Sequence, residues 1–532
     1  MKFNDLSFEK AIYSKGKISP LFLYILLHLS VNSRIQNINS VANYILALDL
    51  GTTGNRAILF DREGNVVGQA YQELTQHYPQ PGWLEHDAEE IWQGTYGCIK
   101  NVINKAQIQA SEIAAIGLTV QRETCLLWDK NTGTPLHKAI VWQDRRTAEM
   151  CDRLKQEGKA PLVQQKTGLI LDAYFSATKL AWLIDWVKQN KADTNWDNFI
   201  AGTVDSWALW KLTGGKVHAT DNSNASRTML MNLDTSDWDA ELLELFNITA
   251  NIMPKIQPSL GVFGTTDPDL LGAEIPITAI FGDQQAALFA HGCDRPGLLK
   301  CTYGTGCFLV AQAGNQVARS NQQLLSTIAW STPQQTNYAL EGAIFTAGAC
   351  IQWLRDGIGL ITEASETETL ASSVENSNGV HFIPALSGLG APHWNMNARG
   401  AFLGITGGVN KAHMVRAVLE AIAYQVKEVV EAVNKDLPQP VSLLKVDGGV
   451  TRNNFLLQFQ ADALGIPVER PKILDATAQG AAFGAGLTVG FWQDYQKLIN
   501  NREIDRVFEP GAGQQTAQDN FLPWTQAVSR VL

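Results

Sequence analysis

The sequence predicts an α/β fold made of two duplicated domains that face one cleft. From Asn43 to the C-terminus, short apolar runs of strand type alternate with amphipathic helical runs. A strand that leads into Asp and Gly occurs twice, at residues 45–51 and 443–449. A Gly-Thr turn between two apolar runs also occurs twice, which indicates an internal duplication. The length of 532 residues is itself too great for one hydrophobic core.

The first hairpin, at residues 45–60, has a turn suited to bind phosphate. Its two apolar runs are separated by Asp49 and by the turn residues Gly51, Thr52, Thr53 and Gly54. Glycine lets the backbone approach a ligand, and consecutive N–H groups with threonine hydroxyls suit phosphate oxygens. Asp49 lies where it could hold a magnesium ion directly or through water. The alternative is an ordinary hairpin whose Asp49 bonds its own turn.

The net charge and the cysteine content limit which classes of partner and which cellular compartment are expected. A formal net charge of −10 argues against a nucleic-acid partner held by bulk electrostatics. The seven cysteines are scattered and include no C-x-x-C pair. They predict a reduced, cytoplasmic compartment, with neither a disulfide framework nor a zinc site.

Residues 1–42 are predicted to form a separate N-terminal extension. They hold five basic and two acidic residues, although the chain as a whole is acidic. The apolar run at 21–27 is too short to span a bilayer, and no small-residue cleavage pattern follows it. We therefore expect no stable membrane insertion and an arm that activity does not require. A membrane-surface anchor is the alternative.

Three predicted strands of the first half end in polar residues. The strands and their polar ends are 113–119 with 121–124, 139–142 with 143–146, and 277–281 with 282–285. In α/β folds, ligands bind beyond the carboxyl ends of strands. These polar ends are therefore the candidate site.

The second half repeats the design of the first. The run at 298–311 predicts a second hairpin, which turns through Gly304-Thr305-Gly306. Apolar residues at helical spacing over 415–430 predict a long amphipathic helix. The Gly/Ala-rich run at 478–486 predicts a helix packed closely against a neighbour or a nucleotide.

The boundary between the halves is predicted near residues 292–297, where Pro296 and two glycines interrupt the pattern. We therefore place one domain at 43–292 and the other at 293–532. The sequence contains neither a G-x-x-x-x-G-K-[ST] loop nor the catalytic motifs of protein kinases. Phosphate-binding hairpins in both halves instead predict the actin-like (ribonuclease H-like) ATPase architecture, in which nucleotide lies in a cleft between two related domains.

Several segments together carry a more specific signal. In order, they are PGWLEHD at 81–87, QRET at 121–124, YFSATKLAW at 174–182, NASRTML at 224–230, GDQQAALF at 282–289, TYGTGCF at 302–308 and GAFLGI at 400–405, the last leading to His413 and Glu420. With these segments the chain resembles the FGGY carbohydrate kinase family from about residue 43 to the C-terminus. Only the extension is left unexplained.

The resemblance implies ATP-dependent phosphorylation of glycerol to sn-glycerol 3-phosphate with Mg²⁺, in a homo-oligomer (dimer or tetramer). Asp283 would be the general base for the attacking hydroxyl. Its plainer interpretation is the N-cap of a helix. The polyol-binding positions implied by the resemblance are Arg122, Glu123, Trp142, Tyr174, Asp283, Gln284 and Phe308. The implied nucleotide-binding positions are Thr52, Thr53, Gly54, Arg56, Thr305, Gly348, Gln352, Gly449 and Asn453. The implied magnesium positions are Asp49 and Asp283.

Other interpretations of these residues stay open. Arg122 and Glu123 could be a solvated surface ion pair, and Trp142 and Phe308 could be plain core. One rival function is a family member that acts on a pentulose or gluconate. The other is an actin-like ATP-binding module, such as a chaperone or a filament protein. The chain also departs from the family at Leu50, where Gln is usual, and at residues 54–55, where two serines are usual.

Residues 267–276 bear on regulation. Some members of the family are inhibited by fructose 1,6-bisphosphate through a glycine-rich loop with an arginine at this place. Here the segment has one glycine, no basic residue and three acidic ones, and acidic groups repel a bisphosphate. Other members are activated by phosphorylation of a histidine in this region, and none lies between His218 and His291. We therefore expect neither form of regulation.

Overall fold

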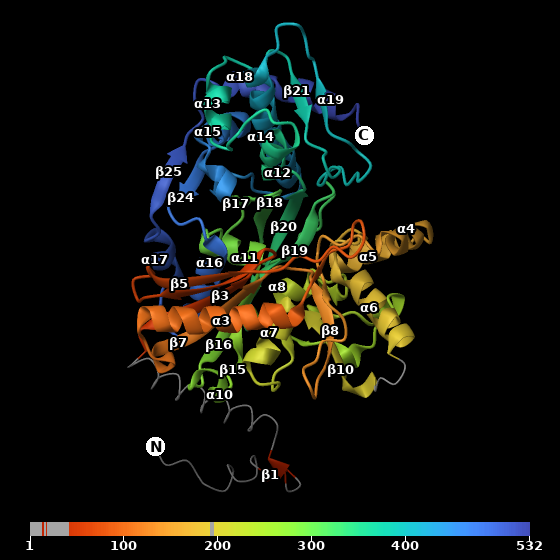
Figure 1. The fold of residues 1–532 in the computed structure, drawn as a ribbon, viewed down its shortest axis with the longest axis vertical. Coiled ribbons are helices and arrows are strands. Elements are labelled where there is room, and N and C mark those ends of the chain that lie inside the picture. Colours follow the sequence, from red (N-terminus) through yellow and green to blue (C-terminus); the bar gives the residue numbers. More distant parts are fainter. Residues whose placement is uncertain (1–12, 15–16, 19–41, 192–195) are drawn as a thin grey trace.

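The computed structural model describes residues 13–14, 17–18, 42–191 and 196–532, and Figure 1 shows the second half of the chain stacked on the first. The predicted extension lies outside the described residues except for Ala42 and two short paired strands, β1 (Tyr13–Ser14) and β2 (Lys17–Ile18). Within the described part of the chain, no helix is long and apolar enough to cross a membrane.

The first half is built on a six-stranded sheet with the order β15-β16-β7-β3-β4-β5. Strands β3 and β4 form the predicted first hairpin, and β7 and β16 follow in parallel on the other side of β3. The outer strands β5 and β15 are antiparallel to their neighbours. The bounds are β3 (Tyr44–Leu50), β4 (Gly54–Phe60), β5 (Val66–Glu73), β7 (Ile113–Val120), β15 (Leu260–Thr265) and β16 (Pro276–Gly282). Apart from Asp49, Asn55 and Arg56 near the turn of the first hairpin, the central strands are mainly apolar, as expected of strands with both faces buried.

The second half repeats this sheet with one strand added, in the order β19-β20-β18-β17-β23-β24-β25. Strands β20, β18, β17, β23, β24 and β25 have the directions of β5, β4, β3, β7, β16 and β15, and β19 is an extra edge strand. The bounds are β17 (Leu298–Tyr303), β18 (Cys307–Gly314), β19 (Leu325–Ser331), β20 (Thr336–Ile344), β23 (Leu443–Asp447), β24 (Val468–Pro471) and β25 (Ile504–Phe508). The predicted duplication is confirmed.

One detail of the predicted repeat is wrong. The sequence pattern equates the strand before Asp447 with the strand before Asp49. In the two sheets, however, β23 before Asp447 takes the place of β7, whereas the equivalent of β3 is β17. The two Asp-Gly signals therefore mark neighbouring strands of the repeat and not the same strand.

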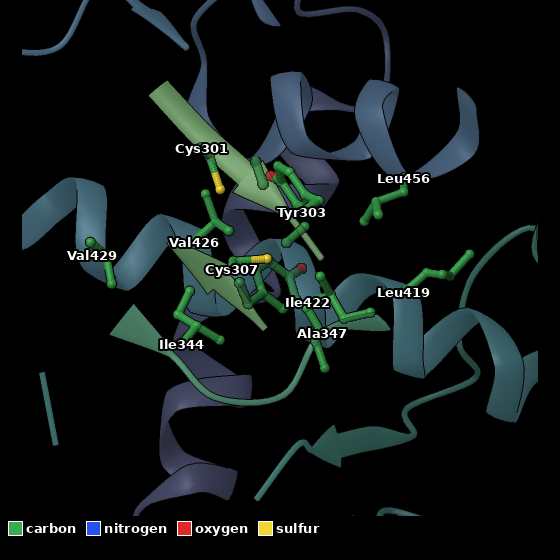
Figure 2. Close-up of a cluster of buried hydrophobic side chains, with 14 of the residues drawn as sticks. Cys301, Tyr303, Cys307, Ile344, Ala347, Leu419, Ile422, Val426, Val429 and Leu456 are labelled. Atoms are coloured by element: carbon green, nitrogen blue, oxygen red, sulfur yellow. The ribbon is translucent and has the colours of Figure 1, made fainter. Parts of the chain in front are cut away.

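The predicted long amphipathic helix is α14 (Lys411–Asp436), which covers one face of the second sheet. It begins where the Asn410 side chain accepts hydrogen bonds from the N–H groups of Ala412 and His413. Figure 2 shows Ile422 and Val426 of this helix beside Tyr303 and Cys307 of the β17–β18 hairpin. The core of the second half lies between this helix and the sheet.

Helix α16 (Ala476–Thr488) belongs to the second half of the chain but packs on the first sheet and on helix α11 (Asp283–Ala290). A Cβ atom on Gly480 would lie 1.9 Å from the carbonyl oxygen of Ala286, and one on Gly117 would lie 2.0 Å from that of Ala481. Only glycine permits these approaches. The predicted close packing is confirmed, and the neighbour is polypeptide.

The remaining helices and strands surround the two large sheets. Helix α3 (Ala88–Ala106) covers β4 and β5, and a small sheet in the order β10-β8-β9-β6 continues from the polar end of β7. The other helices are α4 (Ala148–Gln156), α5 (Ala160–Thr167), α6 (Ser176–Asn190), α7 (Val204–Leu212), α8 (Asn222–Ala225), α9 (Ala240–Leu245), α10 (Pro268–Leu271), α12 (Gly348–Gln352), α13 (Glu366–Ser372), α15 (Asn454–Leu464), α17 (Tyr495–Asn500), α18 (Gln514–Asp519) and α19 (Phe521–Val528). The other strands are β6 (Glu85–His86), β8 (Cys125–Asp129), β9 (Ala139–Ile140), β10 (Phe199–Thr203), β11 (Ala219–Asp221), β12 (Met231–Asn232), β13 (Asp237–Trp238), β14 (Lys255–Gln257), β21 (His381–Ile383) and β22 (Ala401–Leu403).

Candidate active site

Asp283 is the first residue of helix α11, directly after strand β16. The N-cap of this helix is Gly282, so the interpretation of Asp283 as the cap is wrong. The Asp283 carboxylate accepts a hydrogen bond from the Gln284 N–H at 2.7 Å and lies 3.1 Å from Arg122 Nε. Its side chain is 28% exposed, so a ligand can reach it. A carboxylate held in this way at a helix N-terminus is available to accept a proton.

Arg122 and Glu123 follow strand β7, which is the neighbour of β16. Both are buried, at 3% and 2% exposure, so the interpretation as a solvated surface pair is wrong. Glu123 has a backbone φ of 62°, in the left-handed region that a non-glycine residue enters at a cost. Residues in strained backbone conformations persist only where the surrounding structure holds them, and they are found most often at functional sites.

Two further charged residues complete a buried cluster that sequence reasoning missed. Arg122 donates to both oxygens of Glu341, with Nη1–Oε2 at 2.5 Å and Nη2–Oε1 at 3.0 Å. Arg227 donates from Nε to Glu123 at 2.7 Å and from Nη2 to Glu341 at 3.0 Å. Burial alone would raise the pKa of Glu341, but Arg122 and Arg227 together lower it to about 2.

The sequence contains a signal for one of the two missed residues, Glu341. Glu341 is the only charged residue of β20, within the otherwise apolar run 339–344. A lone carboxylate in a buried strand needs a cationic partner. Arg227 lies in one of the family segments, at 224–230, but the pattern there gives it no role.

Three aromatic residues form a wall beside the cluster. The Trp142 ring lies 5.6 Å from the Tyr174 ring and 6.0 Å from the Phe308 ring, both edge-on. Tyr174 Oη accepts a long hydrogen bond, 3.5 Å, from Arg122 Nη2. Trp142 Nε1 donates to Thr52 Oγ1 at 2.9 Å, which ties this wall to the turn of the first hairpin. The predicted polyol-binding residues are thus brought together.

Gln284 has a partner that the sequence did not reveal. Its Oε1 accepts a short hydrogen bond from Nζ of Lys300, a fully buried lysine in β17 that also donates to Thr302 Oγ1 at 2.9 Å. Burial lowers the pKa of Lys300. The side-chain orientation of Gln284 is therefore set by the second half of the chain.

The first hairpin has a carboxylate at its base and a tight turn. Asp49 accepts a hydrogen bond from Thr477 Oγ1 of α16 at 2.8 Å, not from its own turn. Burial raises the pKa of Asp49 to about 6. The hydrogen bond from Thr477 and the charge of Arg56 oppose this rise, and the charge of Asp283 adds to it. Arg56 forms an ion pair with Asp475, just before α16.

Asp49 and Asp283 offer carboxylate oxygens, which are the ligands that a nucleotide-bound magnesium ion would require. The charge of Asp283 contributes to the raised pKa of Asp49, so a cation between the two carboxylates would offset their repulsion. In the described residues, no group of three or more His, Cys, Asp or Glu could hold a metal ion. Mg²⁺ is usually held by one or two carboxylates together with substrate phosphates and water.

A cavity of about 730 Å³ lies in the second half. It contains five predicted nucleotide-binding residues, namely Thr305, Gly348, Gln352, Gly449 and Asn453. The turn of the second hairpin belongs to its lining, where Gly304 O accepts a hydrogen bond from Gly348 N at 3.0 Å and Thr305 O accepts one from Ala349 N at 3.0 Å. The volume suits a nucleotide-sized ligand. The predicted residues of the first hairpin, Thr52, Thr53, Gly54 and Arg56, do not line it.

Known proteins resemble the chain over nearly its whole length. A glycerol kinase of Rippkaea orientalis is 69% identical over 489 residues, which cover 92% of this chain and 98% of the relative. A glycerol kinase of Carboxydothermus hydrogenoformans is 52% identical over 488 residues, with the same coverage. Among solved structures, Plasmodium falciparum glycerol kinase with ADP superposes with a TM-score of 0.85 at 35% identity, covering 92% of this chain and 98% of that one.

The family follows from two profile matches. The N-terminal domain of the FGGY family of carbohydrate kinases matches residues 44–290, and its C-terminal domain matches 299–489. A xylulose kinase of Lactobacillus acidophilus, at 24% identity and a TM-score of 0.83, shares the fold. With the duplicated sheets, these matches confirm the predicted actin-like two-domain fold. The chain belongs to the FGGY family of carbohydrate kinases.

Proposed function

We propose that this chain transfers the γ-phosphoryl group of ATP to a primary hydroxyl of glycerol, giving sn-glycerol 3-phosphate and ADP. The observation that carries this proposal is the convergence of Asp283, Arg122 and Glu123 beside an aromatic wall. The β17–β18 hairpin links this pocket to the cavity, because Phe308 of the wall and Thr305 of the cavity lie three residues apart. The similarity to curated glycerol kinases supports glycerol, and the ADP-bound neighbour supports the nucleotide.

In this proposal, Asp283 takes the proton from the attacking hydroxyl. Phosphoryl transfer needs alignment, charge neutralisation and removal of that proton. Asp283 is suited to the last task because it is partly exposed and is held by Gln284 N–H and Arg122 Nε. A bound Mg²⁺, held by Asp49 and Asp283, would supply charge neutralisation at the phosphates.

The remaining polyol-binding residues would fix the position of the triol. Glu123 offers carboxylate oxygens and Arg122 offers N–H groups, so together they match hydroxyls that both donate and accept. The rings of Trp142, Tyr174 and Phe308 would contact the carbon chain and limit its length. Closure of the cleft over both substrates would exclude water, so that ATP is not hydrolysed.

Nucleotide binding would use both hairpins. The phosphates would lie on the backbone of the turns at Thr52–Thr53 and Thr305, and the remainder of the nucleotide would occupy the cavity beside Gly348, Gln352 and Asn453. The seven cysteines are all buried free thiols, which supports a reduced, cytoplasmic compartment. A dimer or tetramer stays a prediction, which light scattering on the purified protein tests.

A substrate panel with the purified protein tests the proposed function. ATP and Mg²⁺ are supplied with glycerol, xylulose, gluconate or no polyol, and ADP release is measured. We expect the highest kcat/KM with glycerol and little ADP release without a polyol. A preference for xylulose or gluconate would contradict the substrate. ADP release that does not depend on any polyol would instead favour the ATP-binding module.

A further inference from the structure

Glu341 occupies an unusual place for a carboxylate. It lies in the middle of strand β20, is 0% exposed, and has Leu340 and Gly342 as neighbours. It belongs to the second half of the chain, yet both of its cationic partners, Arg122 and Arg227, belong to the first. A buried charge on a strand is costly unless it is paired and hydrogen-bonded. Its presence here requires an explanation that the core of the second half does not supply.

The contacts of Glu341 fix the plane of the Arg122 guanidinium. Two carboxylate oxygens meet the two terminal nitrogens at 2.5 and 3.0 Å, which is the paired geometry that sets orientation as well as distance. The other contacts of these nitrogens are long, 3.4 Å to Gln285 and 3.5 Å to Tyr174. Without Glu341, only weak contacts would hold the outer edge of Arg122.

The guanidinium of Arg122, held in this way, lies beside the proposed base Asp283. Its Nε lies 3.1 Å from the Asp283 carboxylate and 3.8 Å from Glu123. Arg227 joins the same cluster by bridging Glu123 and Glu341. The charges therefore alternate along the chain of contacts Glu123, Arg227, Glu341, Arg122, Asp283. Removal of the central carboxylate would leave two buried guanidinium groups facing each other without their shared partner.

We propose that Glu341 is a positioning residue for the polyol site: it orients Arg122 toward the substrate and Asp283, and with Arg227 it holds Glu123. This inference rests on the proposed function, since it assigns Arg122 and Glu123 to the polyol. It also gives the second sheet a direct part in that site. Strand β20 pairs with β18, where Phe308 lies opposite Ala343, so one pair of strands delivers both Glu341 and an aromatic wall residue.

The test uses Glu341→Gln, with Glu341→Asp as a second variant. Glutamine keeps the size but lacks the charge and one acceptor, and aspartate keeps the charge but is one methylene shorter. Because a misplaced Arg122 weakens polyol contacts and not nucleotide contacts, we expect the KM for the polyol to rise at least about tenfold in Glu341→Gln while the KM for ATP stays within about twofold. We expect Glu341→Asp to lie between wild type and Glu341→Gln.

A matched control separates positioning from general destabilisation. Glu420 is likewise buried and bonded to an arginine, with Arg416 Nε at 2.7 Å, but it lies on α14, which contributes no residue to the polyol cluster or to the lining of the cavity. Glu420→Gln should lower the melting temperature without the selective change in KM. If Glu341→Gln does not fold, the same split between the two KM values is measured in Glu341→Asp. Equal losses for polyol and ATP, or a wild-type KM for the polyol in both Glu341 variants, would overturn the assignment.

Failure of the proposed function is distinguishable from failure of this inference. The wild-type panel decides the substrate, and the Glu341 variants are then assayed with whichever polyol the wild type phosphorylates best. A second readout is the rise in melting temperature caused by each ligand. We expect Glu341→Gln to lose most of the shift caused by the polyol and to keep the shift caused by ADP. Retention of both shifts would contradict the proposal.

Discussion

At the scale of single residues, Asp283 combines two features that a proton acceptor needs. It is reachable, with a 28% exposed side chain, and it is held by a hydrogen bond from Gln284 N–H and by an ion pair with Arg122, whose Nε lies 3.1 Å away. Asp283→Asn removes the acceptor but keeps the shape, so we expect kcat to fall by at least ~10²-fold with a melting temperature near that of wild type. Steady-state kinetics and a thermal scan check both.

Asp269 is a matched control for Asp283, because it also lies in the first turn of a helix, α10, but before the first residue of β16, whereas Asp283 follows the last. Asp269→Asn should leave kcat unchanged. A folded Asp283→Asn protein with nearly normal kcat would exclude Asp283 as the base.

Asp49 predicts a pH dependence of stability. Burial raises its pKa from the ordinary 3.8 to about 6, so the folded protein binds this proton more tightly than the unfolded chain does. The resulting stabilisation is complete below the unfolded pKa of 3.8 and is lost as the pH rises through about 6. Asp49→Asn cannot titrate. We therefore expect the melting temperature of the ligand-free variant to rise relative to wild type between about pH 4 and about pH 7.

The exposed Asp185 on α6 provides the comparison for this measurement. Asp185→Asn removes one negative charge from an exposed site and so controls for the change in net charge. Parallel curves for Asp49→Asn and wild type would show that Asp49 has no raised pKa in the folded protein.

At the scale of elements, the contact between α16 and α11 sets where Asp283 lies. Replacement of Gly480 by Ala would add about 0.5–1 kcal/mol of helix propensity. It would also force a Cβ to within 1.9 Å of the Ala286 carbonyl oxygen, and overpacking against backbone costs about 1–3 kcal/mol. The steric cost prevails, so we expect Gly480→Ala to be less stable in urea unfolding and to have a lower kcat.

Gly407 is the control position for this substitution. A Cβ there meets nothing within 4 Å, and its backbone φ is not in the positive range. Gly407→Ala should therefore be neutral or slightly stabilising. If Gly480→Ala were as stable and as active as Gly407→Ala, helices α16 and α11 would be able to move apart without loss of stability or activity. That result would contradict the prediction.

The segment at 267–276 is the second element with a testable consequence. Its short helix α10 is capped by Asp267, whose carboxylate also binds Lys216 at 3.1 Å. The cation that reaches this segment is thus already paired, and the segment itself has only acidic charges. We expect no saturable inhibition by fructose 1,6-bisphosphate in initial-rate assays at subsaturating glycerol. If inhibition appears, Lys255 and Arg295 are the cations to replace first.

At the scale of the whole molecule, the sequence could predict what depends on local pattern. Both hairpins, the strands at 113–119 and 277–281 and the long helix follow from apolar periodicity and glycine turns, and the structure places them as expected. The third predicted strand with a polar end, at 139–142, is wrong in extent and place: it is only β9 (Ala139–Ile140), in the small antiparallel sheet. Arg122, Glu123, Asp283 and Gln284 could be located because they follow the ends of two strands, β7 and β16. Tyr174 precedes helix α6 and is located only by the resemblance to the family. The partners of Glu341 and Lys300 could not be predicted, because Arg122 and Gln284 belong to the other half of the chain. Hydrophobic periodicity predicts which face of a strand is buried, but it does not predict which side chain from a distant part of the chain contacts that face.

The boundary between the domains depends on contacts between residues that are far apart in the sequence. Residues 43–292 were assigned to one domain because the pattern is interrupted after them, and this boundary stays a prediction. The structure closes the first sheet with α16, from residues 476–488, and neutralises Arg122 and Arg227 with Glu341. The first half of the chain is therefore complete in sequence pattern but incomplete in packing and in charge.

We therefore expect a fragment of residues 43–292 to lack a stable fold of its own. Without α16, the face of β7 and β16 around Gly117 would lose its apolar cover. Without Glu341, two buried guanidinium groups would lose a partner, and breaking a buried pair costs about 3–5 kcal/mol. Whole domains are stable by only about 5–15 kcal/mol. Thermal scans should show no cooperative transition for the fragment alone, and co-expression with residues 293–532 should restore one. A fragment that unfolds cooperatively near the melting temperature of the intact chain would instead establish residues 43–292 as an independent domain, with α16 and Glu341 as additions to it.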